Sequence, residues 1–168
     1  MAVAAGGALG PIGVSMQPYA TFALNAFVAV AALWDLTERK IPNRLVVVGL
    51  LVAFGLQAQA AGLSGLGAGL AGSLAGFGLL FPMFALRQMG GGDVKLALTV
   101  GAFLDWRGAV HIVLFGTIAH GAIALLMLFR RKVLETMGRP ALEHSAVPHA
   151  VGFALATWAY AAGFGHFF

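Results

Sequence analysis

The stretch GAVHIVLFGTIAHGAIALLMLF, residues 108–129, contains no Asp, Glu, Lys or Arg. A helix of this length rises about 33 Å, enough to cross the hydrocarbon core of a bilayer, which is roughly 30 Å thick. Three basic residues, Arg130, Arg131 and Lys132, follow it directly. Basic residues at the end of an apolar run are typical of a transmembrane helix that ends on the cytoplasmic side. The stretch therefore predicts a membrane-spanning helix.

The composition of the whole chain agrees with this prediction. Hydrophobic residues make up 60% of the 168 residues and charged residues only 10%, whereas roughly a quarter of a typical soluble domain is charged. So few charged side chains cannot cover the surface of a soluble globule. Apolar runs and short connections take up nearly the whole length, so we expect one membrane-embedded domain over residues 1–168.

Further apolar runs flank the first one on both sides. Helices are expected over Pro18 to Trp34, Leu45 to Gly62, Leu66 to Leu86, Val94 to Leu104, Gly108 to Phe129 and Val147 to Phe168. The predicted fold class is all-α, a polytopic membrane protein with about six transmembrane helices. The run from Val94 rises only about 16 Å. Either this helix continues through Asp105, Trp106 and Arg107, or the glycine turn before it dips below the membrane surface, which we favour.

Small residues recur at every fourth position in the third run. Ala68, Gly72 and Gly76 form one series, and Gly65 and Gly69 form another. This spacing lets two helix backbones approach closely. We interpret the series as a packing surface.

The basic residues predict how the chain is oriented in the membrane. With six spans, nine of the ten Lys and Arg residues fall on one side, and only Arg107 falls on the other. The positive-inside rule then places both termini outside the cytoplasm. Met1 to Leu33 contains no Lys or Arg, so the basic region of a cleavable signal peptide is missing and the first run is expected to stay in place.

Several kinds of chemistry find no support in the sequence. Cysteine is absent, which excludes disulfides, thiol nucleophiles and thiolate metal sites. The five histidines show no H-E-x-x-H or comparable spacing, so neither a metal nor a cofactor is predicted. The basic residues cluster at the ends of apolar runs without forming a stripe, and a nucleic-acid partner is therefore not expected.

Two of the six carboxylates, Asp35 and Asp93, lie at the ends of apolar runs on the predicted cytoplasmic side. Acidic residues inside or at the edge of a membrane are usually functional or paired. Two neighbouring carboxylates share one proton, so one can activate water while the other polarises a carbonyl. The alternative is helix capping, which suits Asp93 at a helix N-terminus but not Asp35 at a C-terminus, where the helix dipole disfavours an anion.

The residues around Asp93 are candidates for positioning a substrate. Gly90, Gly91 and Gly92 could adopt backbone angles closed to other residues and let an extended chain approach closely, although a tight turn is the alternative. Lys95 lies two residues beyond Asp93 and hence on another face of the helix. We group it with the glycines, although snorkelling to lipid phosphates also fits it.

The first connection carries a second recognisable pattern. Pro42 suits the start of the second helix, with Asn43 as a possible N-cap.

Both patterns together carry a family resemblance. The residues that carry it are Asp35, Arg39-Lys40-Ile41-Pro42-Asn43, Gly90-Gly91-Gly92-Asp93 and Lys95. In these the chain resembles the type IV prepilin peptidases, aspartyl proteases with a G-x-G-D motif. Its short form, without an added soluble domain, is similar to the branch that serves tight-adherence (Flp) pili.

The resemblance implies that Asp35 and Asp93 are a catalytic pair. It implies an endopeptidase that removes the short basic leader of Flp-like prepilins at the cytoplasmic face of the bacterial cytoplasmic (inner) membrane. Its partners would be the prepilin substrate and the lipid bilayer. Methylation of the new N-terminus, which larger members perform, is not expected here. The oligomeric state is not predicted.

Two other functions remain open from the residues alone. A proton-coupled membrane transporter could use Asp35 and Asp93 as proton carriers, and a scaffold for pilus assembly would need neither. Transporters usually show internal repeats and midplane sites, whereas this chain has no evident repeat and places both acids near one membrane face. For the peptidase, we expect the two carboxylates to be at least partly separated without substrate.

Overall fold

The computed structural model describes residues 17–38, 40–87, 89–137 and 149–161, and every regular element in them is a helix. These helices are α1 (Pro18–Glu38), α2 (Asn43–Ala85), α3 (Gly91–Phe103), α4 (Trp106–Thr136) and α5 (His149–Ala161). The all-α prediction is confirmed. The ends of the last predicted helix, residues 147–148 and 162–168, lie outside the described residues.

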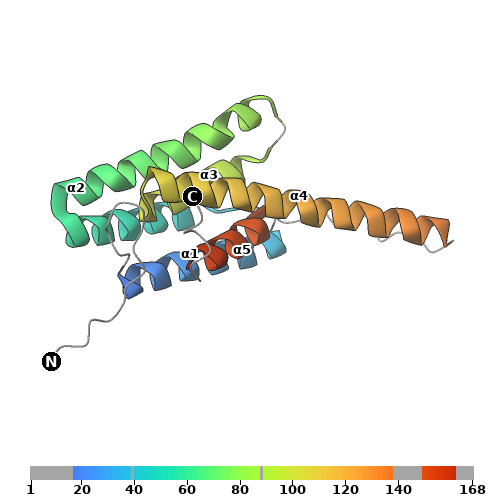
Figure 1. Ribbon diagram of the computed structural model, residues 1–168, viewed down its shortest axis with the longest axis horizontal. Coiled ribbons are helices and arrows are strands. Elements are labelled where there is room, and N and C mark those ends of the chain that lie inside the picture. Colours follow the sequence, from blue (N-terminus) through green and yellow to red (C-terminus); the bar gives the residue numbers. More distant parts are fainter. Residues whose placement is uncertain (1–16, 39, 88, 138–148, 162–168) are drawn as a thin grey trace.

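Helix α2 consists of two segments that fold back on each other. Ala61 and Gly62 have non-helical backbone angles, and Gly62 has a φ of 57°, a left-handed value that glycine adopts at no steric cost. The chain reverses at this point, so the two segments run side by side (Figure 1). They correspond to the second and third predicted helices, joined by a turn of two residues.

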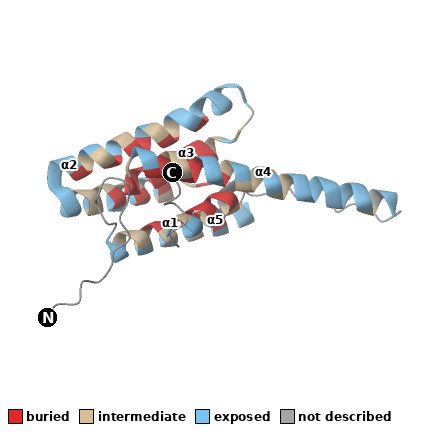
Figure 2. Cartoon of the chain, viewed as in Figure 1, coloured by how far each residue is buried: buried red, intermediate tan, exposed pale blue. Residues whose placement is uncertain are grey.

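Helix α3 lies at the centre of the bundle, and most of its residues are buried (Figure 2). The second segment of α2 packs directly on it through glycine. A side chain at Gly72 would overlap the carbonyl of Gly101, and one at Gly76 would overlap the carbonyl of Ala97. The glycine spacing thus serves helix packing, as the sequence predicts.

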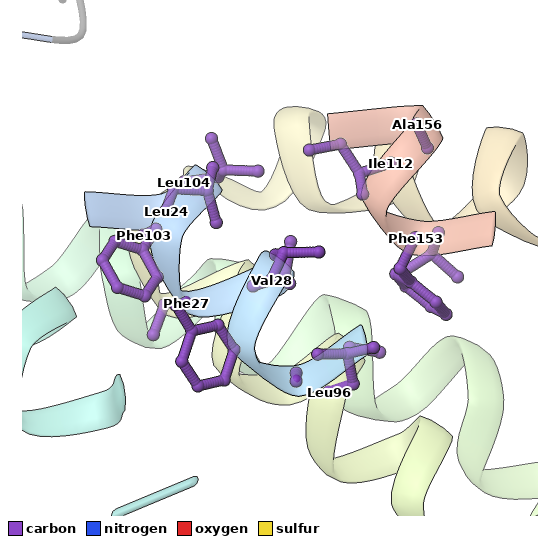
Figure 3. Packing of buried hydrophobic residues seen from close by; sticks show 14 of the residues in the cluster. Leu24, Phe27, Val28, Leu96, Phe103, Leu104, Ile112, Phe153 and Ala156 are labelled. Atoms are coloured by element: carbon purple, nitrogen blue, oxygen red, sulfur yellow. The ribbon is translucent and has the colours of Figure 1, made fainter. Parts of the chain in front are cut away.

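The remaining helices enclose α3 through an apolar core (Figure 3). Phe27 of α1 and Phe103 of α3 lie with their ring centroids 6.0 Å apart. At the same Phe27 ring, a side chain at Gly49 of α2 would overlap the ring and would also come within 2.7 Å of Thr99 on α3. Helices α1, α2 and α3 therefore meet where only glycine fits on α2.

A polar side chain forms hydrogen bonds with the backbone carbonyls at the C-terminal end of α3. The Gln57 side chain on α2 donates to the carbonyls of Ala102 and Leu104, at 3.4 and 3.3 Å. Just beyond, the Asp105 carboxylate accepts a hydrogen bond of 2.8 Å from the Gly108 backbone and so caps α4. Asp105 therefore has a structural role, and α4 begins at Trp106, two residues before the expected start at Gly108.

Three of the described helices are long and apolar enough to cross a membrane, namely α1, α2 and the 106–134 part of α4. Large apolar side chains are exposed along all three, for example Phe22, Leu51 and Leu125. The structure thus fits a membrane protein. Helix α3 has only 13 residues and begins at Gly91, three residues before the expected start at Val94.

Candidate active site

The two candidate acids lie where α1 ends and α3 begins. Asp35 is in the last turn of α1 and is half-buried. Asp93 is in the first turn of α3 and only 6% exposed. Thr37 closes the end of α1 by donating to the carbonyls of Leu33 and Trp34, each at 3.1 Å. Both acids therefore sit on regular helix, at the ends that the sequence indicates.

Asp93 precedes the apolar run of α3, and its surroundings favour the protonated form. Burial raises the pKa of its carboxyl above the ordinary value, and the negative charge of Asp35 raises it further. The structure thus brings Asp35 and Asp93 within electrostatic reach of each other, as the sequence predicts. The separation expected without substrate remains a prediction.

A backbone hydrogen bond holds the Asp93 carboxylate in place. Gly90 is the N-cap residue of α3, and its backbone N–H donates to the carboxylate, which opposes the rise in pKa. A side chain at the third helical position that bonds back to the N-cap residue is one half of a capping box. Asp93 therefore both caps its helix and faces a second acid, so the capping alternative and the pairing hypothesis are compatible.

The glycine run differs from the expectation. Gly90 has a φ of −73° and a ψ of 147°, which any residue can adopt, and Gly91 and Gly92 are helical. Among the described residues, only Gly62 and Arg87 have a positive φ. The predicted use of backbone angles closed to other residues is wrong here.

Close packing accounts for one of these glycines instead. A side chain at Gly91 would approach the Phe84 ring to 3.2 Å, whereas at Gly92 it would make an ordinary contact of 3.6 Å with Ile41. At Gly90 it would lie 3.4 Å from the Asp93 carboxylate. Gly91 therefore lets α3 begin directly against α2, and Gly90 leaves the carboxylate uncovered on that side.

Lys95 connects the two sequence patterns. Its ammonium donates a hydrogen bond of 2.7 Å to the Asn43 side-chain oxygen. Pro42 is the N-cap residue of α2, Asn43 is its first helical residue, and no side chain caps this end. The predicted N-cap at Asn43 is therefore wrong, because Pro42 occupies the N-cap position. Snorkelling of Lys95 to lipid stays a prediction.

Residues that sequence reasoning overlooked also shape the site. Ile41 is 6% exposed and belongs to the core cluster, and Phe84 packs on Gly91. Ile41 is the apolar residue in the pattern of the first connection, between charged and polar neighbours, and this isolated position was a signal of burial. Nothing in the sequence around Phe84 distinguished it from the other aromatic residues of its run.

The described residues contain no group of three or more His, Cys, Asp or Glu side chains that could hold a metal ion. His111 makes a local contact instead, with its Nδ1 atom 2.9 Å from the carbonyl of Arg107.

A family model, described as the type IV leader peptidase family, matches residues 22–126. The chain belongs to this family. The match covers most of α1, all of α2 and α3 and two thirds of α4, and it includes both aspartates. The family predicted from the residues is confirmed, and the chain is a leader-peptidase-like protease with a protein substrate. Neither the curated proteins nor the solved structures contain a match.

Proposed function

We propose that the chain is an aspartyl endopeptidase that removes the short basic leader of Flp-like type IV prepilins. The observation that carries this proposal is the buried Asp93 carboxyl, whose pKa is raised by burial and by Asp35, in a chain of the type IV leader peptidase family. A protonated acid beside an ionised one is the arrangement that peptide hydrolysis by paired carboxylates requires.

The chemistry divides between the two acids. Asp93 holds the shared proton and donates a hydrogen bond to the oxygen of the scissile carbonyl. Asp35 accepts a proton from a water molecule, whose oxygen then forms a bond to the carbonyl carbon. The proton taken from the water passes to the leaving nitrogen as the C–N bond breaks, which leaves a carboxylic acid and a free amine. The pair titrates as one coupled unit in this scheme.

The residues of the glycine run, with Lys95, position the substrate. Gly90 is exposed beside the Asp93 carboxylate, so an extended peptide reaches the acid there without meeting a side chain. Gly91 and Gly92 hold the first turn of α3 against Phe84 and Ile41. Lys95 acts from the outer face of the helix through Asn43.

The site lies at the cytoplasmic face of the bacterial inner membrane, with both termini outside the cytoplasm and about six spans. In this arrangement the two segments of α2 count as separate spans, and α3 and α5 complete the set. The Lys95 to Asn43 hydrogen bond supports the placement, because it puts the α1 to α2 connection and the start of α3 at the same end of the bundle. Cleavage then falls where a prepilin leader leaves the membrane.

Incubation of the purified, detergent-solubilised protein with an Flp-type prepilin, followed by mass, tests the proposal. The native chain should release the leader, and Asp35→Asn and Asp93→Asn should not. Asp105→Asn is the matched control, because asparagine caps a helix about as well as aspartate. Cleavage at a rate close to the native one in either of the first two variants contradicts the catalytic pair. Absence of cleavage by the native chain on every matched prepilin favours a proton-coupled transporter.

A further inference from the structure

One side-chain hydrogen bond joins the two sequence patterns of the site. Lys95 on α3 donates to Asn43 at the start of α2, 52 residues away in the chain, at 2.7 Å. Asn43 follows Asp35 by one short connection, and Lys95 follows Asp93 by half a helical turn. The bond therefore links the segments that carry the two acids.

The two residues of α3 involved here face in different directions. Residues two apart on a helix lie roughly 200° apart around its axis. The Asp93 side chain is buried and interacts electrostatically with Asp35, whereas Lys95 is the one exposed residue of α3. Lys95 therefore acts on the connection before α2 and not on the carboxylates directly.

A second contact holds the same connection to the same helical turn. Ile41 is buried, and its side chain lies in van der Waals range of the space above Gly92. The connection that leaves Asp35 thus touches the first turn of α3 through one apolar side chain and through one charged hydrogen bond. Hydrogen bonds to charged groups are stronger than neutral ones, so the Lys95 bond is the more specific of the two contacts.

We propose that Asn43 and Lys95 form a positioning pair, which sets the separation of Asp35 and Asp93 by tying the α1 to α2 connection to α3. Neither residue touches the scissile bond. The inference rests on the proposed function, because it concerns the spacing of the same two acids. A small misplacement of catalytic groups costs rate far more than substrate affinity.

Kinetics of four variants test the pair. Asn43→Ala and Lys95→Met should each lower kcat about tenfold or more, with KM within about threefold of the native value. The double variant should be no slower than either single variant, because one bond is lost in all three. Asn43→Asp should keep most of kcat, because its carboxylate accepts from Lys95 in place of the amide.

Other outcomes of this cycle overturn the pair. An unchanged kcat in Asn43→Ala does so, as does a double variant whose loss is the product of the single losses. A rise in KM at constant kcat in Lys95→Met also overturns the pair, because it leaves Lys95 with the proposed substrate-positioning role alone. Lys132→Met, at an exposed position of α4, is the matched control and should behave as the native chain.

Hydrogen exchange separates failure of this inference from failure of the proposed function. The amides of Leu45 and Val46 bond to the carbonyl of Pro42 at the start of α2. They should exchange faster in Asn43→Ala and in Lys95→Met than in Lys132→Met, whether or not a prepilin is cleaved. Equal exchange in all variants overturns the pair even if the native chain is an active peptidase.

Discussion

The two ends of α3 are held in different ways. At its C-terminal end, Gly101 lies backbone to backbone against Gly72 of α2, and Gln57 donates to the last carbonyls. At its N-terminal end the contacts are made by side chains, which can change rotamer. These are the side chains of Ile41, Phe84 and Lys95.

Each end also carries an aspartate close to a helix start. Asp105 caps α4 with a hydrogen bond of 2.8 Å to Gly108 and has an ordinary structural role. Asp93 bonds to its own N-cap residue but is buried and lies near Asp35. A position at a helix start therefore does not define the role of an acid. Burial and the nearby Asp35 distinguish Asp93 from Asp105.

Exchange of each aspartate for asparagine gives the largest contrast between the two ends. Asp93→Asn should lower kcat for prepilin cleavage by about 10²–10⁴-fold, the usual contribution of a general acid or base. Asp105→Asn should change it by less than about twofold, because the cap is retained. Cleavage rates at saturating prepilin measure both. Similar losses in the two variants would remove the distinction.

Replacing one glycine by alanine at each end of α3 compares how tightly the two ends are packed. Gly101→Ala should destabilise the protein by about 1–3 kcal/mol, as overpacking does, because the new group overlaps the carbonyl of Gly72. Gly92→Ala should stay within about 0.5 kcal/mol of native, because its methyl makes an ordinary contact with Ile41 and alanine favours the helix. Unfolding in detergent measures both, and a larger loss at Gly92 would reverse the comparison.

The pH dependence of stability should differ between native protein and Asp93→Asn. The pKa of Asp93 is raised in the folded chain by burial and by Asp35, so the folded state binds this proton more tightly than the unfolded state. Its contribution favours folding below the unfolded pKa of about 3.9 and is lost as pH rises through the folded value. The native melting temperature should therefore fall more steeply above about pH 4 than that of Asp93→Asn.

Gly92→Ala is the control for this series and should follow the native slope. Parallel slopes for native protein and Asp93→Asn would mean that the carboxyl ionises in the folded chain as it does in the unfolded one.

The smallest expected effect concerns the C-terminal end of α3. Gln57→Leu removes the donor to the carbonyls of Ala102 and Leu104 and should cost about 1 kcal/mol of unfolding free energy. Gln59→Leu, at an exposed position of the same helix, is the matched control and should cost less. If both changes cost the same, the Gln57 contact does not stabilise this end.

The helices could be predicted from the sequence because the length and apolar composition of each run are local properties that indicate a helix. The runs gave the two segments of α2 and most of α1 and α4. Helix α3 was expected to begin at Val94 but begins at Gly91, because glycine adds nothing to hydropathy although it can be helical. Its first turn is stabilised by the bond from Gly90 to Asp93, which no apolar pattern reveals.

The two candidate acids could be picked out from the sequence, whereas the residues that contact the site around them could be predicted only in part. Asp35 and Asp93 were conspicuous, because carboxylates at the ends of apolar runs are rare and costly. The local pattern predicts Asn43 as a cap and does not show its contact with Lys95, which lies 52 residues away in the chain. The role of the glycine run could not be predicted for the same reason. Its contacts with Phe84 and Ile41 exist only in the folded chain.

Contact between α2 and α3 through bare glycine backbones has a mechanical consequence. Such an interface contains no rotamers that could switch between alternative packings, so Gly72, Gly76 and their partners on α3 move as one rigid body. Under the proposed function, any movement that admits a substrate then leaves this interface intact.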